Sequence, residues 1–331
     1  IYTPASKKRD ILFYLCLSLL VSVCPSVNNK KFLSQFFKPK RKSAMMTAEV
    51  VPGPSSVIER SIKEATAMEL KEEDEDVSPD KKQKLAAGDE DSNDEKKQEE
   101  IQAYMDETFD VRRSFITVEM PTALAVKQTY PQLFTGRQML AEFQRITNLD
   151  IDHLIQEYCV KHANNIIAIA KYISGSNIIL RQAEEIKQQN AALKQYWDMV
   201  TALSLIPMLL KENFVEMVVE ITEDQKVDPK GKIVPILISK GTIFRSDEFF
   251  LVIEEEIVQE FEEFTIAYAT LFAAYWVFNM QYPKTLNNSY NFIQKAIIHL
   301  KDGTPIPPPC KQLVQRLLKM ETAENVKQKK K

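Results

Sequence analysis

The centre of the predicted fold is the segment Phe264–Met280, which reads FTIAYATLFAAYWVFNM. Its aromatic and aliphatic side chains fall on nearly every side of a helix with 3.6 residues per turn. A helix that is apolar all round has to be surrounded by protein, whereas a surface helix carries one apolar stripe. We therefore expect a helix over about residues 262–281, placed centrally in the core.

Further helices are predicted on both sides of this segment, because apolar residues recur there at spacings of three and four. Thr135 and Gln138 match a capping box, in which the hydroxyl accepts from a helical amide and the glutamine reaches back. Gly175 and Ser176 are expected to end one helix and cap the next. The predicted helices cover residues 99–113, 121–129, 151–173, 177–205, 286–300 and 310–323, and one more follows Thr135 with its buried face within residues 139–146.

Between residues 214 and 253 the pattern changes to short runs rich in Val, Ile and Phe, which is typical of strands. We expect three strands, at residues 214–221, 233–238 and 249–253, with a turn at residues 228–231. Pro235 cannot donate to a sheet ladder and predicts an edge position for the second strand. The predicted fold class is therefore mainly α with a small β element of about three strands within residues 214–253.

The N-terminal third has a different composition. No aromatic residue lies between Phe37 and Tyr104, and residues 69–100 carry fourteen acids against six lysines. Such a segment has too little apolar surface to offset the entropy of ordering, so residues 46–98 are expected to be disordered. Within them, Ile58, Ile62, Ala65 and Glu69 fall on one helical face and predict a transient helix. A single helical domain over residues 99–325 and a basic tail over residues 326–331 complete the expected organisation.

Residues 1–45 carry nine Lys or Arg against one acid. Three interpretations stay open for this leader. The first is that the native chain starts at Met45 or Met46. The second is a signal or membrane anchor built on the apolar run at residues 11–23, which is short for a membrane span. The third is a local buried helix. We expect the first.

The segment 177–205 is the longest predicted helix. An alternation of four and three, typical of a coiled-coil seam, runs through Ile179, Ala183, Ile186, Asn190, Leu193, Trp197 and Val200. Self-association through this helix is one interpretation. The other is antiparallel packing inside the domain, which we favour because three heptads is a short run.

Several short motifs resemble, in the same order, the C-terminal region shared by multicopy, chiefly fish, proteins of the sterile alpha motif domain-containing 3-like family. The resemblance covers residues 99–320 and implies a fold, but no catalytic residues. No sterile alpha motif is evident here. Glu254-Glu255-Glu256 stands where that family tends to carry a glycine, which argues against a tight turn. The motifs are Tyr104–Arg113, Tyr130–Thr135, Ala141–Thr147, Ile206–Leu210, and Leu271–Phe272 running to Asn279–Lys284.

The search for chemistry yields little. Cys159 lies on an apolar stripe and is expected in the core. His153 and His162 are nine apart on one helix and point in opposing directions, so we expect no metal site and no cofactor. Asp247, Glu254 and Glu255 are the only candidates for a metal-dependent nuclease, which multicopy, mobile-element-like ancestry would favour. Arg112, Arg113, Arg137 and Arg145 could form a basic face for nucleic acid.

Basic clusters give a second kind of signal. Lys81, Lys82 and Lys84 resemble a nuclear-import sequence, and Ser78 and Ser92 sit in phosphorylation-like contexts that would add negative charge beside them. The sequence therefore predicts an intracellular protein-interaction module, nuclear or cytoplasmic and without catalysis. The alternatives are a nuclease-like or nucleic-acid-binding protein of mobile-element origin, and a secreted or membrane-tethered protein that uses residues 11–23.

Overall fold

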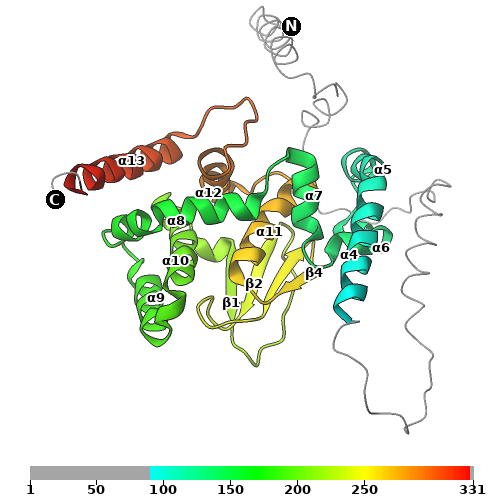
Figure 1. The fold of residues 1–331 in the computed structure, drawn as a ribbon, viewed down its shortest axis with the longest axis horizontal. Helices are drawn as coiled ribbons and strands as arrows, with labels where there is room; N and C mark the ends of the chain where they lie inside the picture. The colour runs from blue at the N-terminus through cyan, green and yellow to red at the C-terminus, as the bar shows by residue number, and fades with distance from the viewer. Residues whose placement is uncertain (1–89, 329–331) are drawn as a thin grey trace, which may run out of the picture. The chain divides into compact units, whose positions relative to one another are not determined.

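The computed structural model describes residues 90–328, with side chains described for residues 96–322. Within these residues the chain is mostly helical and contains one four-stranded sheet (Figure 1). The predicted leader at residues 1–45 and the predicted disorder at residues 46–89 lie outside the described residues.

The sheet has the order β1-β2-β3-β4, with β1 parallel to β2 and the other pairs antiparallel. β2 is an inner strand, so the edge position predicted from Pro235 is wrong. Pro235 comes just before the strand, where its missing N–H leaves the ladder intact. The strands are β1 (Val218–Ile221), β2 (Ile236–Lys240), β3 (Phe249–Ile253) and β4 (Glu256–Phe261).

The fourth strand was not predicted, because the acids from Glu254 to Glu256 suggested a solvated surface. Glu254 and Glu255 instead form the tight turn between β3 and β4, with φ of 52° and 66°. This left-handed backbone is unfavourable for residues with a Cβ, so contacts must hold it. The Glu254 amide donates to the Ile233 carbonyl at 3.2 Å, and the Glu255 amide donates to that of Lys232 at 2.9 Å.

The helix α11 (Phe264–Val277) lies at the centre of the core, as predicted. Every one of its side chains except Ile266 is buried. It packs against β2, β3 and β4 and also against two helices, α7 (Gln138–Thr147) and α8 (Ile151–Ala170) (Figure 1). Its all-round apolar surface therefore contacts the sheet and the helical layer together.

The first described helices form a corner beside α7 and β4. The helix predicted over residues 99–113 begins earlier, at Glu90, inside the segment expected to be disordered, and it breaks at Thr108. The predicted capping box is wrong: Thr135 donates its hydroxyl hydrogen to the Gln132 carbonyl and does not cap α7. The elements are α4 (Glu90–Glu107), α5 (Phe109–Ser114), a π-helix (Phe115–Glu119), α6 (Ala123–Thr129) and a 3-10 helix (Pro131–Phe134).

The long helix predicted over residues 177–205 is two helices, α9 (Asn177–Gln189) and α10 (Lys194–Leu209). Asn190 ends α9 with φ −137° and ψ 76°, and a 3-10 turn over Ala191–Leu193 follows. Asn side chains compete with helical hydrogen bonding, so an Asn in a helix interior is a weak point. α9 and α10 then pack against each other.

The C-terminal part also departs from the predicted boundaries. The helix expected over residues 286–300 is α12 (Asn287–Phe292) followed by a π-helix (Ile293–Ile297). The last helix, α13 (Pro308–Gln328), packs against α8 and α12 and extends into the predicted basic tail. The prediction that Gly175 ends one helix and Ser176 caps the next is wrong: α8 ends at Ala170, Gly175 has φ +87° in the turn that follows, and Ser176 does not cap α9. Its hydroxyl bonds the Ala170 carbonyl at 2.6 Å.

Candidate functional site

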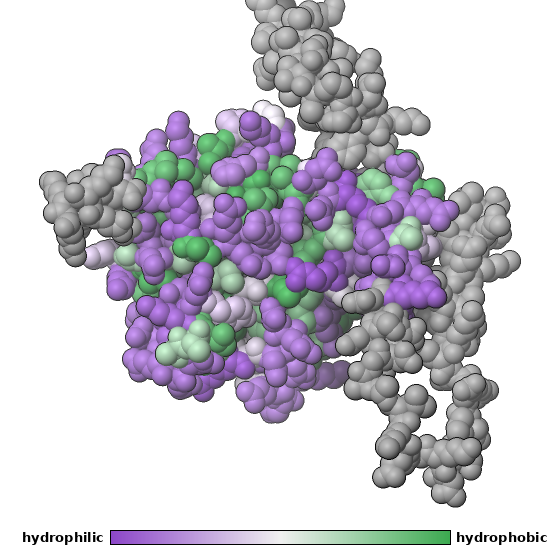
Figure 2. Space-filling model, viewed as in Figure 1, coloured by the Kyte–Doolittle hydropathy of each residue, from purple (hydrophilic) through white to green (hydrophobic). Residues whose placement is uncertain are grey.

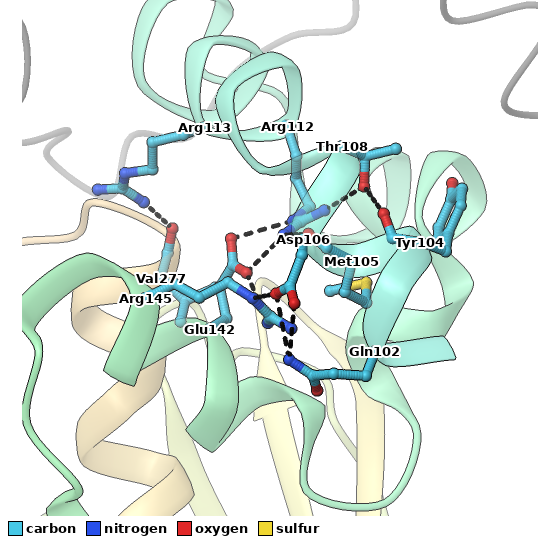
Figure 3. A network of polar contacts seen from close by, with 10 residues as sticks. All are labelled: Gln102, Tyr104, Met105, Asp106, Thr108, Arg112, Arg113, Glu142, Arg145 and Val277. Carbon is cyan, nitrogen blue, oxygen red and sulfur yellow. Dashed lines mark hydrogen bonds and ion pairs between the residues drawn. The ribbon is translucent and has the colours of Figure 1, made fainter. Parts of the chain in front are cut away.

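Arg112 lies at the centre of a cluster of polar side chains between α4, α5 and α7 (Figure 3). Its Nε donates to Glu142 Oε1 at 3.0 Å and its Nη2 donates to Glu142 Oε2 at 2.6 Å. Nη1 donates to Thr108 Oγ1 at 2.6 Å, and Nη2 also donates to the Met105 carbonyl at 2.8 Å. The Arg112 and Glu142 side chains are both 0% exposed. Two parallel charge-assisted bonds make this a strong and directional pair.

A second layer of this cluster reaches the surface. Arg145 Nε donates to Asp106 Oδ1 at 2.6 Å, and its Nη1 donates to Glu142 Oε2 at 3.3 Å. Gln102 Nε2 donates to the same Asp106 oxygen at 3.1 Å. The Asp106 side chain is more than half exposed, whereas Arg145 is mostly buried. The cluster therefore contains a fully buried ion pair, Arg112–Glu142, and a partly exposed one, Arg145–Asp106.

Arg113 connects the same corner to the central helix. Its Nη1 donates to the carbonyl oxygen of Val277, at the C-terminal end of α11, at 2.6 Å (Figure 3). Burial lowers the pKa of Arg113 to about 10; Glu142 opposes this shift and Arg112 adds to it. The side chain remains a cation at neutral pH, and the end of a helix is where a cation is favoured. We call Asp106, Arg112, Arg113, Glu142 and Arg145 the arginine network.

The local sequence explains how the network forms. The Thr108 hydroxyl bonds back to the Tyr104 carbonyl at 2.7 Å, a contact that bends helices, and the chain passes from α4 to α5 there. Arg112 follows Thr108 by one helical turn, so the two side chains meet. On α7, Glu142 and Arg145 are three residues apart and share a face.

Aromatic rings close the site around Arg112. Its guanidinium carbon lies 5.7 Å from the centre of the Tyr130 ring and 6.0 Å from that of Phe109. These distances allow cation–π attraction, which is stronger where water is excluded. Burial raises the pKa of Tyr130 to about 12, so the ring stays neutral at neutral pH. With no exposed face, Arg112 and Glu142 can brace helices but cannot reach a substrate.

The basic face predicted from four arginines is wrong. Arg112 and Arg113 are buried, and Arg145 is shared between Asp106 and Glu142. Arg137 is half exposed and forms an ion pair with Asp152. A charged residue is expected at the surface unless a partner is known. The partners here are up to 39 residues away in sequence, so the sequence did not reveal them. Arg112, Arg137 and Arg145 are therefore paired with carboxylates, and Arg113 is bound to the Val277 carbonyl.

The acids proposed for metal chemistry do not come together. Asp247 precedes β3 and Glu254 follows it, so their backbones are on the order of 20 Å apart at strand geometry. Glu254 Oε2 accepts from the Ala123 amide at 2.7 Å, and Glu255 Oε1 accepts from the Gly231 amide at 2.7 Å. Two-metal sites hold their ions about 4 Å apart, so this trio cannot form one. Among the described residues, no group of three His, Cys, Asp or Glu side chains converges on a metal position.

The proposed coiled-coil seam is divided by the α9–α10 hairpin. Lys187 and Asp198 form an ion pair of 3.0 Å that joins the two helices. Self-association stays a prediction. Of the seam residues, Ile179, Ile186 and Trp197 are partly buried, whereas Asn190 and Leu193 are exposed on the turn.

The other predicted sites have separate outcomes. Lys81, Lys82, Lys84 and Ser78 lie outside the described residues, and Ser92 falls in the first turn of α4. Cys159 is buried, as predicted, and burial raises its pKa to about 12, which makes it a poor nucleophile.

The two histidines of α8 differ. His153 is exposed, whereas His162 is buried and its Nδ1 lies 3.3 Å from Glu321 Oε1 on α13. Burial lowers the pKa of His162; Glu321 opposes this shift and Lys161 adds to it. Over the part of the chain that the structure describes, no helix has both the length and the apolar character needed to cross a membrane.

The fold and the arginine network define a mainly helical domain with an embedded mixed sheet and a sealed polar brace. Sterile alpha motif domain-containing protein 3 of Homo sapiens is similar to this chain, with 26% identity over 215 residues. The similar region covers 64% of this chain and 39% of the human protein, so the chain spans well under half of that relative. No protein-family model matches the chain, and no solved structure matches it.

The structure gives two of the resembling motifs a physical role. Tyr104–Arg113 supplies Asp106, Arg112 and Arg113, and Ala141–Thr147 supplies Glu142 and Arg145. All the residues of the arginine network therefore come from these two short motifs. Both motifs carry acids and arginines, but nothing in their spacing pairs a residue of one with a residue of the other.

Proposed function

We propose that this chain is a protein-interaction module that acts without catalysis. The observation that carries the proposal is a group of large apolar side chains exposed within residues 111–124. Exposed apolar residues are ordinary when they are scattered singly, but several together mark contact sites. We call this group the corner patch. Its members, with exposed fractions, are Val111 (39%), Val118 (53%), Met120 (48%) and Leu124 (39%).

The arginine network supports the proposal in two ways. First, its arginines are already bound to Glu142, Asp106 or the Val277 carbonyl, and Arg112 and Glu142 have no exposed surface for a substrate. Second, it fixes α5 against α7 and α11. The residues of the corner patch, which belong to α5 and the segments that follow it, are therefore held in a defined position. Preorganised surfaces bind more tightly because they lose less entropy on association.

The corner patch has only four exposed members, which favours a transient partner. The face shown in Figure 2 is largely hydrophilic, with small apolar areas between polar ones. Obligate interfaces are large and resemble a domain core cut in half, whereas transient ones are smaller and more polar. A reversible contact with another protein fits this surface better than a permanent complex does.

The test uses the full chain fused to a proximity-labelling enzyme in cells. Val118→Asp with Leu124→Asp should remove a specific group of labelled neighbours. Val160→Asp is the matched control, because Val160 is 64% exposed on α8, outside the corner patch. Thermal unfolding of each purified variant has to match the parent. Identical neighbours for parent and patch variant would contradict the proposal.

We propose a nuclear location on the basis of Lys81, Lys82 and Lys84, with the cytoplasm as the alternative. A fluorescent fusion that starts at Met46 should accumulate in nuclei and lose this accumulation when the three lysines are replaced by alanine. A diffuse signal that the replacement leaves unchanged would contradict the nuclear location. Mass-spectrometric mapping of the mature N-terminus tests the secreted alternative built on residues 11–23.

A further inference from the structure

A groove lies where α8 and α10 end beside the first half of α13. Its volume is about 420 Å³. Ile173, Leu209 and Leu313 contribute apolar surface, and Lys211 and Arg316 contribute positive charge. No Asp or Glu is among its lining residues. The groove therefore combines an apolar floor with a positive margin.

The two cations of this groove are not paired with Glu212, which follows Lys211 in sequence and accepts hydrogen bonds from the Asn288 and Ser289 amides. Lys211 and Arg316 are both exposed, and within residues 96–322 neither has a carboxylate at ion-pair distance. Lys211 has φ +62° at the reversal that follows α10, which fixes its position beside α13. An occupant with an apolar stripe and carboxylates at one end would match both features of the groove.

We propose that residues 58–70 of the same chain occupy this groove as an amphipathic helix. Their sequence, IERSIKEATAMEL, places Ile58, Ile62 and Ala65 on one face and ends that face with Glu69. Residues 69–76 carry six acids against one lysine. The apolar stripe fits the floor of the groove, and the acidic end fits Lys211 and Arg316.

The length of the intervening chain permits this contact. Residues 71–89 form a connection of nineteen residues to the start of α4. Such a chain spans about 65 Å when extended. A domain of this size has a radius of gyration of about 17 Å, hence a diameter of about 45 Å. The extended connection is longer than the diameter, so the segment can reach surfaces far from the start of α4, and the tether raises its effective concentration into the millimolar range.

The inference goes beyond the proposed function, because the groove and the corner patch are made of different residues.

Hydrogen–deuterium exchange of the full chain tests the proposal. Amides of residues 58–70 should exchange about tenfold more slowly than those of an unstructured peptide, because docking protects them. Lys211→Glu with Arg316→Glu should abolish the protection. Adding Glu69→Lys and Glu72→Lys to that variant should restore it, since the charges are exchanged. Lys194→Glu with Lys319→Glu, at exposed positions outside the groove, is the charge-matched control and should retain it.

Three results would overturn the proposal. The first is unprotected exchange of residues 58–70 in the parent chain. The second is protection that survives reversal of Lys211 and Arg316, which would place the segment elsewhere. The third is protection that fades on dilution from 20 to 1 µM (about twentyfold), which would show docking between copies, since a tethered contact does not depend on concentration. These three exchange measurements do not depend on the corner patch. Failure of the proposed function and failure of this docking proposal can therefore be told apart.

Discussion

The arginine network and the contact between α8 and α13 both join helices that are distant in sequence, but their polar chemistry differs. Arg112 and Glu142 are fully buried and form two direct hydrogen bonds. His162 and Glu321 approach to 3.3 Å, yet His162 Nδ1 and Glu321 Oε1 have no hydrogen-bond partner. The first contact is a permanent charge pair, and the second changes with the protonation of an imidazole. The comparison separates a brace that is independent of pH from a contact that depends on it.

The largest effect is expected from Glu142→Leu. This change leaves the Arg112 guanidinium buried without its carboxylate, which typically costs about 3–5 kcal/mol. Chemical denaturation should show a matching loss in the free energy of unfolding. Glu157→Leu, at an exposed position on α8, is the control and should change it by less than about 0.5 kcal/mol. Equal losses from the two variants would contradict the role assigned to Glu142.

A smaller effect is expected from Arg113→Met. The Val277 carbonyl oxygen would lose its charged donor, and an unsatisfied buried acceptor costs about 1–3 kcal/mol. The loss of positive charge beside Arg112 removes an unfavourable interaction and offsets part of this cost. Calorimetric unfolding should therefore place this variant between the parent and Glu142→Leu. A variant less stable than Glu142→Leu would show that Arg113 dominates the corner.

The contact between α8 and α13 predicts a pH effect. Because burial lowers the pKa of His162, the folded chain favours the neutral form of this side chain more than the unfolded chain does. Its contribution to stability is present above the unfolded pKa of about 6.5 and is lost as pH falls through the folded value. Tyr158 and Lys161 on α8 and Glu321 on α13 face this ring.

Melting temperatures measured from pH 7.5 to pH 5.5 should fall less steeply in His162→Gln than in the parent. His153→Gln is the matched control, because His153 is exposed on the same helix, and it should retain the parental slope. If His162→Gln left the slope unchanged, another group would have to account for the pH dependence.

The smallest effect is expected from Lys161→Ala. Lys161 lies 3.4 Å from Glu321 and its side chain is 63% exposed, so water screens the pair. Exposed pairs contribute about 0–1 kcal/mol. Thermal unfolding at neutral pH should be almost unchanged, and a large loss would show that the α8–α13 contact is chiefly ionic.

Periodicity in the sequence predicted the buried helix α11, the helix α8 and the strand β3, because apolar spacing directly reports which face is buried. It did not predict the break at Asn190, since no glycine or proline marks it and the apolar spacing continues through Ala191 and Leu193. It also missed β4, whose preceding turn uses two glutamates in place of the usual Asn or Gly. At the β3–β4 turn, hydrogen bonds to the Ile233 and Lys232 carbonyls hold the backbone, whereas at Asn190 the side chain's own competition for hydrogen bonds weakens the helix.

The arginine network could not be predicted from the sequence for a related reason. Arg112 and Glu142 are thirty residues apart, and nothing in the spacing of either one identifies the other. A single charged residue is read as exposed, so four arginines suggested a surface for nucleic acid. Only the packing of α4, α5 and α7 shows that Arg112 and Arg145 are paired with acids and that Arg113 is buried.

The most direct test of the brace is a double-mutant cycle on Arg112 and Glu142. Arg112→Met and Glu142→Leu should each destabilise the chain by about 3–5 kcal/mol, because each leaves a charge unpaired in the interior. The double variant should unfold with a free energy within about 1.5 kcal/mol of the parent, because an apolar pair of similar volume replaces the ion pair. Losses that simply add in the double variant would contradict the account, since they would mean that the two side chains stabilise the fold independently.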